Sequence, residues 1–212
     1  MKSPNFHEID TAYGRKGYKF YTKGAFNINL FGIRSMNSKS NSFDDLVGAA
    51  LYLDATHPIV FAANATTDPG KYWLQNPMHR EGTAILVPGQ YAGSHCVGIH
   101  GRSGKNPYEA LEQVGNMTYV RDNNKDMKLD FELYRDPQQL KLNAFTANIK
   151  SNIHRAHLNL LVQLVEKYSA ACQVIQSATE FQKLLELCKE AVKRGFPNRF
   201  TYTLFEEDQV WN

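Results

Sequence analysis

Residues 46–67, LVGAALYLDATHPIVFAANATT, decide the fold class of this chain. Two short apolar runs, 46–53 and 58–67, flank the polar tetrapeptide DATH. Short apolar runs bounded by turn residues are typical of buried strands, whereas helices generally need about ten residues or more. The stretch therefore predicts a pair of strands. TTDPG at 66–70 predicts a turn after them, because proline and glycine supply its fixed and its permissive backbone dihedrals.

Most of the remaining chain also favours strands. The stretches whose apolar residues alternate or form short runs are 18–34, 82–91, 95–101, 117–134, 145–156 and 199–207. Within 117–134 the pattern indicates two strands around a polar turn, and within 145–156 a strand whose end carries His154. NPYEALEQV at 106–114 predicts one or two helical turns instead.

One long helix is predicted near the C-terminus. Ser177 and Glu180 have the spacing of a capping box, and Gly195 with Pro197 ends the helical pattern. The apolar residues that then share one helical face are Phe181, Leu184, Leu185, Cys188 and Val192.

The sum of these elements is a β-rich α+β fold. With 12% aromatic and 21% charged residues the chain is globular, and its length suits a single domain over 1–212. Residues 1–45 are a candidate peripheral N-terminal extension of that domain. No run approaches the roughly 20 apolar residues of a membrane span, so we expect no stable membrane insertion.

Charge and cysteine content narrow the class of protein further. The net charge is +3 with Lys and Arg scattered along the chain, which argues against a nucleic-acid partner. Three cysteines form an odd and sparse set that suits reduced thiols rather than a disulfide framework. The beginning, MKSPNFHEID, lacks an apolar signal core, so we expect synthesis in the cytoplasm without a signal peptide.

The segment 158–172 leaves two interpretations of Cys172 open. Its apolar residues are frequent enough for a helix, in which Cys172 and Cys188 would be buried packing residues. Alternatively Cys172 is a nucleophile, and His154, eighteen residues earlier, is its base. A thiol attacks near neutral pH only as the thiolate, so the second interpretation requires a base or a cation beside the sulfur.

His154, followed after a variable stretch by Ser-Ala-Ala-Cys at 169–172, resembles the signature of the L,D-transpeptidase (YkuD-like) catalytic domain. In that family a strand-end His, usually followed by Gly, precedes a Ser/Thr-His-Gly-Cys element. The Ser-to-Cys offset of three is the same here, and the His-to-Cys gap falls within the family's usual range. Arg155 stands in place of the Gly, and two alanines replace the His and Gly of the element.

The resemblance implies the L,D-transpeptidase catalytic fold and a site without cofactor or metal. It assigns Cys172 as nucleophile, His154 as base and then acid, and the N–H groups of Ala171 and Cys172 as oxyanion donors. Ser169 is expected to shape the turn beneath them. In the family a backbone carbonyl holds the second imidazole nitrogen. Residues expected to contact substrate are Arg155, which suits a carboxylate, His100 at a strand end, and Trp73, which suits stacking.

A second resemblance covers most of the chain. The segments ATTDPGKYWL, GTAILVPGQY, VGIHGRSGKNPYEALEQ and YVRDNNKDMKLDF together look like an unexported phage and prophage family of lysins or cell-wall peptidases. It implies a monomeric cysteine peptidase of the endolysin kind that cleaves peptide stems or cross-links of bacterial peptidoglycan after release by a holin. The alternatives are an L,D-transpeptidase or L,D-carboxypeptidase of wall maturation, and a non-enzymatic virion or wall-binding protein.

Two cation sites remain as weaker alternatives. His95, Cys96 and His100, with His154 and His157, include enough ligands for zinc, although their spacings match no known zinc pattern. DNNKDMKLD at 122–130 imitates the start of a calcium loop, but Met127 replaces the expected glycine and Leu133 the bidentate acid. A solvated turn is the simpler prediction for this segment.

Overall fold

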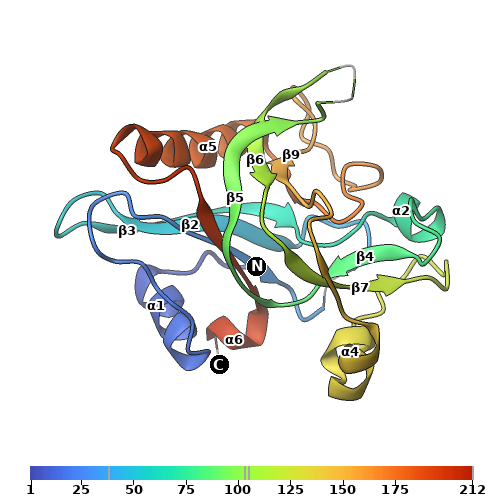
Figure 1. The fold of residues 1–212 in the computed structure, drawn as a ribbon. Helices are drawn as coiled ribbons and strands as arrows, with labels where there is room; N and C mark the ends of the chain where they lie inside the picture. Colours follow the sequence, from blue (N-terminus) through green and yellow to red (C-terminus); the bar gives the residue numbers. More distant parts are fainter. Residues whose placement is uncertain (38, 103, 105, 212) are drawn as a thin grey trace.

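An eight-stranded closed barrel forms the body of the protein, with a three-stranded sheet beside it (Figure 1). The computed structural model describes residues 1–37, 39–102, 104 and 106–211. Around the barrel the strand order is β1-β11-β5-β6-β9-β10-β3-β2, and the smaller sheet has the order β4-β7-β8. This mixture of strands and helices confirms the expected α+β class.

The strands are, in chain order, β1 (Asn29–Arg34), β2 (Asp45–Tyr52), β3 (Pro58–Thr66), β4 (Thr83–Leu86), β5 (Gly89–His100), β6 (Tyr108–Gln113), β7 (Met117–Asp122), β8 (Phe145–Ala147), β9 (Ile153–Arg155), β10 (Gln173–Ile175) and β11 (Phe200–Glu206). The helices are α1 (Phe6–Arg15), α2 (Lys71–Gln75), α3 (Glu132–Arg135), α4 (Pro137–Asn143), α5 (Ala178–Lys193) and α6 (Glu207–Trp211).

The hairpin of β2 and β3 confirms the prediction made from residues 46–67. The two strands are antiparallel, with partners running from Asp45 and Ala65 to Tyr52 and Pro58. A Cβ atom at Gly48 would lie 2.0 Å from a backbone oxygen of β3, so the strands approach closely only because this residue has no side chain.

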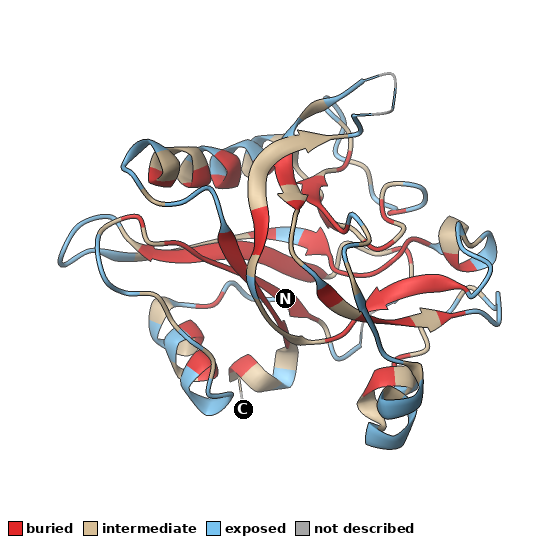
Figure 2. Ribbon diagram, in the orientation of Figure 1, coloured by how far each residue is buried: buried red, intermediate tan, exposed pale blue. Residues whose placement is uncertain are grey.

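Helix α5 confirms the predicted C-terminal helix, and its buried face packs against the barrel core. The Ser177 side chain accepts a hydrogen bond from the Glu180 N–H, and Gly195 has the left-handed φ of +95° that follows many helix ends. The buried face of the helix is Phe181, Leu184, Leu185, Cys188 and Ala191. Cys188 is therefore a packing residue. Buried residues are concentrated along the barrel strands and along this face of α5 (Figure 2).

Helix α1 was not expected from the sequence. Asn5 and Glu8 form a capping box at its start, and Ile9, Ala12 and Tyr13 pack against the outer face of β1 and β11. Strand β1 itself is paired on both sides, antiparallel to β2 and parallel to β11. In the stretch 18–34, strand structure is confined to the residues of β1.

The single strand predicted over 145–156 is divided between two sheets, as β8 of the small sheet and β9 of the barrel. Two further element predictions are wrong. Residues 106–114 contain strand β6, because six residues of β5 pair with it in antiparallel register, from His95 and Gln113 to His100 and Tyr108. The second strand predicted within 117–134 is absent from this described stretch, where β7 is followed by irregular chain and helix α3. Tertiary pairing and packing override local pattern in both places.

A buried arginine joins the barrel to the small sheet. Arg34, fully buried in β1, forms an ion pair of 2.8 Å with Asp68 and donates to the carbonyl oxygens of Thr67 and Leu86. It also donates to the Tyr134 hydroxyl. The groups that accept from Arg34 thus lie in the barrel, in β4 and in α3. A buried charge requires such partners.

The segment 158–172 is not a helix. It is an irregular loop that leaves β9 and returns to begin β10, and β9 and β10 are adjacent parallel strands. Four leucines of this loop, Leu158, Leu160, Leu161 and Leu164, are 55–63% exposed. The helical interpretation of Cys172 is therefore wrong.

Candidate functional site

His154 lies in β9, and Cys172 directly precedes β10, the neighbouring parallel strand. Gln173 is in register with Ile153, and Val174 with His154. Ile153 belongs to the barrel core and Gln173 accepts a hydrogen bond from the buried Tyr202 hydroxyl, so both point into the barrel. Because side chains alternate along a strand, His154 points to the outer face of the barrel, whereas Cys172 lies in the irregular chain that enters β10.

Strand register sets the separation of the two Cβ atoms. Cys172 precedes the register partner of His154 by two residues. With about 4.8 Å between strands and about 3.3 Å of rise per residue, the two Cβ atoms are roughly 8 Å apart. The two side chains are not hydrogen-bonded to each other, because the thiol donates to the Lys150 oxygen and Nε2 of His154 has no partner among the described residues.

The tautomer of His154 is fixed by a backbone carbonyl. Its Nδ1 lies 2.7 Å from the carbonyl oxygen of Arg155, which can only accept, so Nδ1 carries the proton. The Tyr108 hydroxyl lies 3.1 Å from the same nitrogen and itself donates to the Arg155 oxygen. Nε2 is therefore the basic nitrogen, and among the described residues this buried atom has no hydrogen-bond partner.

Both members of the pair are uncharged at rest. Burial, and then the positive charge that the neighbouring His100 can carry, lower the pKa of His154 to about 3. Burial raises the pKa of the Cys172 thiol to about 11, against a smaller opposing effect of the Asn152 backbone. The thiol donates a weak hydrogen bond of 3.5 Å to the Lys150 oxygen, and Lys150 has a left-handed φ of +61°.

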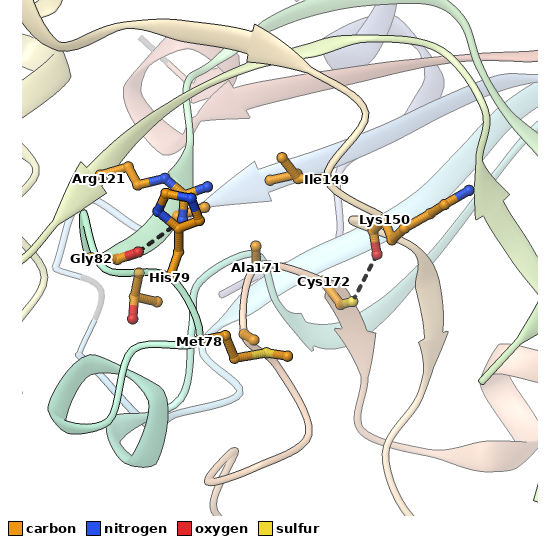
Figure 3. Close-up of a pocket in the computed structure, with 11 residues that line it drawn as sticks. Met78, His79, Gly82, Arg121, Ile149, Lys150, Ala171 and Cys172 are labelled. Atoms are coloured by element: carbon orange, nitrogen blue, oxygen red, sulfur yellow. Dashed lines mark hydrogen bonds between the residues drawn. The ribbon is translucent and has the colours of Figure 1, made fainter. Parts of the chain in front are cut away.

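A cavity of about 350 Å³ opens beside the sulfur (Figure 3). On one side its wall is formed by Ile149, Lys150, Ala170, Ala171 and Cys172, and on the other by Met78, His79, Gly82, Thr83, Ala84 and Arg121. The wall carries two cationic side chains and no acid, and the close-up shows the sulfur and the Lys150 carbonyl together at one side. The Lys150 ammonium pairs with Glu112 at 3.5 Å, and Arg121 donates to the Gly82 carbonyl oxygen. The cavity can admit a group that reaches the thiol, whereas His154 does not belong to its wall.

The turn before Cys172 is held by Ser169. This buried hydroxyl donates to the carbonyl oxygen of Cys172 at 2.8 Å, not to the thiol, so its role in the structure is to shape the turn. Ala171 does not belong to the residues with positive φ, so alanine is accommodated where the related motif has glycine. The N–H groups of Ala171 and Cys172 thus stand in a turn fixed by side-chain bonding.

The expected substrate contacts separate into two places. The Arg155 guanidinium lies 4.0 Å over the Tyr108 ring, and His100 stacks on His154 at 3.9 Å between ring centroids. Both therefore belong to the surroundings of the base. Trp73 lies in α2, donates to the Lys167 carbonyl and is not part of the cavity wall.

Three residues of this site were missed by the sequence analysis. Tyr108 was hidden by the helical prediction for 106–114. Asn152 is buried and bonds to both Gln113 and His100, and Lys150 supplies the carbonyl for the thiol. Alternation in 145–156 could not have placed Lys150, Asn152 and His154 together, because 148–152 is irregular chain and Lys150 has a positive φ.

Neither cation alternative is supported by the arrangement of ligands. Throughout the described part of the chain, no group of three or more His, Cys, Asp and Glu side chains could hold a metal ion. His95 is instead bonded to Ser94 and to the Ser151 carbonyl inside the fold. In the turn at 122–130, the Asn124 side chain donates a hydrogen bond to the Asp130 carboxylate, so these polar groups bond to each other within the turn.

No family model matches the chain, and no curated protein or solved structure matches it. Within the described ranges, none of the helices combines the length and the apolar character needed to cross a membrane.

Proposed function

We propose that the protein is a cysteine peptidase that cleaves peptide stems or cross-links of bacterial peptidoglycan. The observation that carries the proposal is the unprotonated, unpartnered Nε2 of His154 one strand away from the Cys172 thiol. The choice of a peptidoglycan substrate, the L,D-transpeptidase-like fold and the endolysin setting rest on the resemblance of residues 154–172 and of the longer segments.

The resting pair indicates general-base activation rather than a preformed ion pair. As the sulfur attacks the scissile carbonyl carbon, the thiol proton passes to Nε2 of His154, and the N–H groups of Ala171 and Cys172 face the developing oxyanion. The carbon–nitrogen bond then breaks, and Nε2 returns the proton to the leaving amine. Water attacks the thioester in the same way, which releases the acid and restores the thiol.

Because a backbone carbonyl accepts from Nδ1 of His154, the mechanism does not need a carboxylate as a third catalytic residue. The Arg155 oxygen holds Nδ1–H throughout, so the proton can enter and leave only at Nε2. Water is favoured as the acceptor over an amine because a lysin opens the wall rather than building it.

The test is hydrolysis of purified sacculi, measured as loss of turbidity, and of muropeptides, whose products are identified by mass spectrometry. Cys172→Ala should reduce cleavage to background, and His154→Ala should reduce kcat by about 10²–10⁴-fold. Cys96→Ser is the matched thiol control, because Cys96 lies in β5 and should not affect cleavage. Full cleavage by Cys172→Ala would overturn Cys172 as the nucleophile. Binding to sacculi without cleavage, equal in the unaltered and Cys172→Ala chains, would favour a non-enzymatic wall-binding protein, and new cross-links in the products would favour a transpeptidase.

A further inference from the structure

A second imidazole lies flat against the proposed base. The ring centroids of His100 and His154 are 3.9 Å apart and their planes are inclined by only 23°. His100 is the last residue of β5, and β6 separates β5 from β9 in the barrel. The two histidines are therefore brought together by the barrel, not by the local chain.

The proton of His100 can be placed from its partner Asn152. The backbone N–H of Gln113 donates to Asn152 Oδ1 at 2.8 Å, and because a backbone N–H only donates, this fixes the amide orientation. Asn152 Nδ2 therefore donates to His100 Nδ1 at 3.1 Å. His100 Nδ1 must be unprotonated to accept this bond, so neutral His100 carries its proton on Nε2.

The two stacked rings thus have opposite tautomers, with the His154 proton on Nδ1 and the His100 proton on Nε2. The titratable and charged groups that face His100 are His154 and Arg155 of β9 and Tyr108 of β6. Cys172, directly before β10, interacts electrostatically with Tyr108. Burial and Arg155 both lower the pKa of His100, so its surroundings favour the neutral ring.

We propose that His100 is a positioning residue for His154, and that it holds the basic Nε2 in place only while it is itself uncharged. A neutral ring face stabilises the imidazolium that forms on His154 when the thiol is deprotonated, by the attraction between a cation and a π-system. A protonated His100 would instead repel that charge. The kinetic consequence rests on the proposed function, whereas the tautomers do not.

The tautomers are tested by long-range ¹H–¹⁵N NMR of the histidine-labelled full chain at pH 7. The expected result is a neutral His100 protonated at Nε2 and a neutral His154 protonated at Nδ1. A charged His100, or one protonated at Nδ1, would overturn the proposal.

Asn152→Asp replaces the amide N–H that donates to His100 Nδ1 with a carboxylate oxygen that can only accept. The carboxylate still accepts from the Gln113 N–H, but it now favours a proton on His100 Nδ1 and should raise the pKa of His100 by about 1–3 units. The acid limb of the muropeptide kcat profile should move to higher pH by the same amount. Asn143→Asp, which adds the same charge on α4, should move neither, and an unmoved acid limb in Asn152→Asp would overturn the proposal.

Two substitutions of His100 separate positioning from simple folding. His100→Ala removes the ring face and should lower kcat on the order of a hundredfold, with KM little changed. His100→Phe keeps a flat, uncharged ring and should recover most of that loss; equal losses in both variants would contradict the proposal. If the unaltered chain cleaves no muropeptide, the proposed function fails, and a change in the NMR titration of His154 in Asn152→Asp still decides whether His100 acts on it.

Discussion

At the scale of single residues, burial keeps both the Cys172 thiol and the His154 imidazole uncharged. The sulfur donates to the Lys150 carbonyl, and burial disfavours its thiolate. The imidazole lies where a charge would be unsolvated, and its Nε2 is left as a bare acceptor. Proton transfer between them is then part of the reaction and not a property of the resting chain.

This resting state predicts a slow thiol. With a pKa of about 11, Cys172 should react with iodoacetamide at pH 7 on the order of a hundredfold more slowly than a free cysteine. The rate should rise with pH toward 11, because the thiolate fraction rises. Site-resolved mass spectrometry measures this rate, with the Cys172→Ala chain as background for Cys96. Fast, pH-independent labelling below pH 6 would instead indicate a resting thiolate–imidazolium pair.

His154 also predicts an acid sensitivity of folding. Its pKa is lowered to about 3 in the folded chain, so between that value and the ordinary value near 6.5 the unfolded chain binds more protons. Stability from this group is full above the ordinary pKa and falls as the pH drops toward 3, by about 1.4 kcal/mol per pH unit. Urea denaturation from pH 7 to 4 should show a shallower pH dependence for His154→Gln. Parallel curves for the two chains would contradict the prediction.

At the scale of elements, the loop between β9 and β10 contributes little to the fold although it is rich in leucine. Leu160 and Leu161 are more than 60% exposed, so their side chains lose little contact with water on folding. The combined Leu160→Ser and Leu161→Ser variant should therefore change the free energy of unfolding by no more than about 0.5 kcal/mol per site. Leu184→Ala in α5, which is fully buried, should by contrast cost about 2–5 kcal/mol in the same denaturation assay.

The start of α5 should depend on one hydroxyl. Ser177→Ala leaves the Glu180 N–H without its side-chain acceptor and should lower the free energy of unfolding by about 1 kcal/mol. Thr179→Ala, at an exposed position in the first turn, is the matched control and should have a smaller effect. Equal effects of the two substitutions in thermal or urea denaturation would rule out the cap as a source of stability.

At the scale of the whole molecule, the buried Arg34 network holds the barrel against the small sheet and α3. Arg34→Met would leave Asp68, and Asp45 behind it, in the interior without the cation that balances them. Because removing one partner of a buried ion pair strands the other, the loss should be about 3–5 kcal/mol. Arg102→Met breaks an exposed ion pair with Glu112 and should cost at most about 1 kcal/mol in the same urea titration.

The sequence by itself determined those elements whose pattern is complete within a few residues. The β2–β3 hairpin follows from two apolar runs around DATH, and α5 follows from Ser177, an apolar face and Gly195. The family resemblance of residues 154–172 singled out His154, which lies in β9, and Cys172, which directly precedes the adjacent strand β10. The hairpin and the helix are local features, so nearest-neighbour physical chemistry suffices to predict them.

Only the tertiary structure decided the elements and contacts that depend on distant residues. Tyr108 lies in a strand because β5 supplies its hydrogen bonds, and 158–172 is a loop because β9 and β10 pair in parallel on either side of it. The tautomers of His100 and His154 depend on Asn152, Gln113 and a carbonyl, whose approach requires the closed barrel. Hydrogen-bond partners and burial set protonation, and neither is encoded in the spacing of residues along the chain.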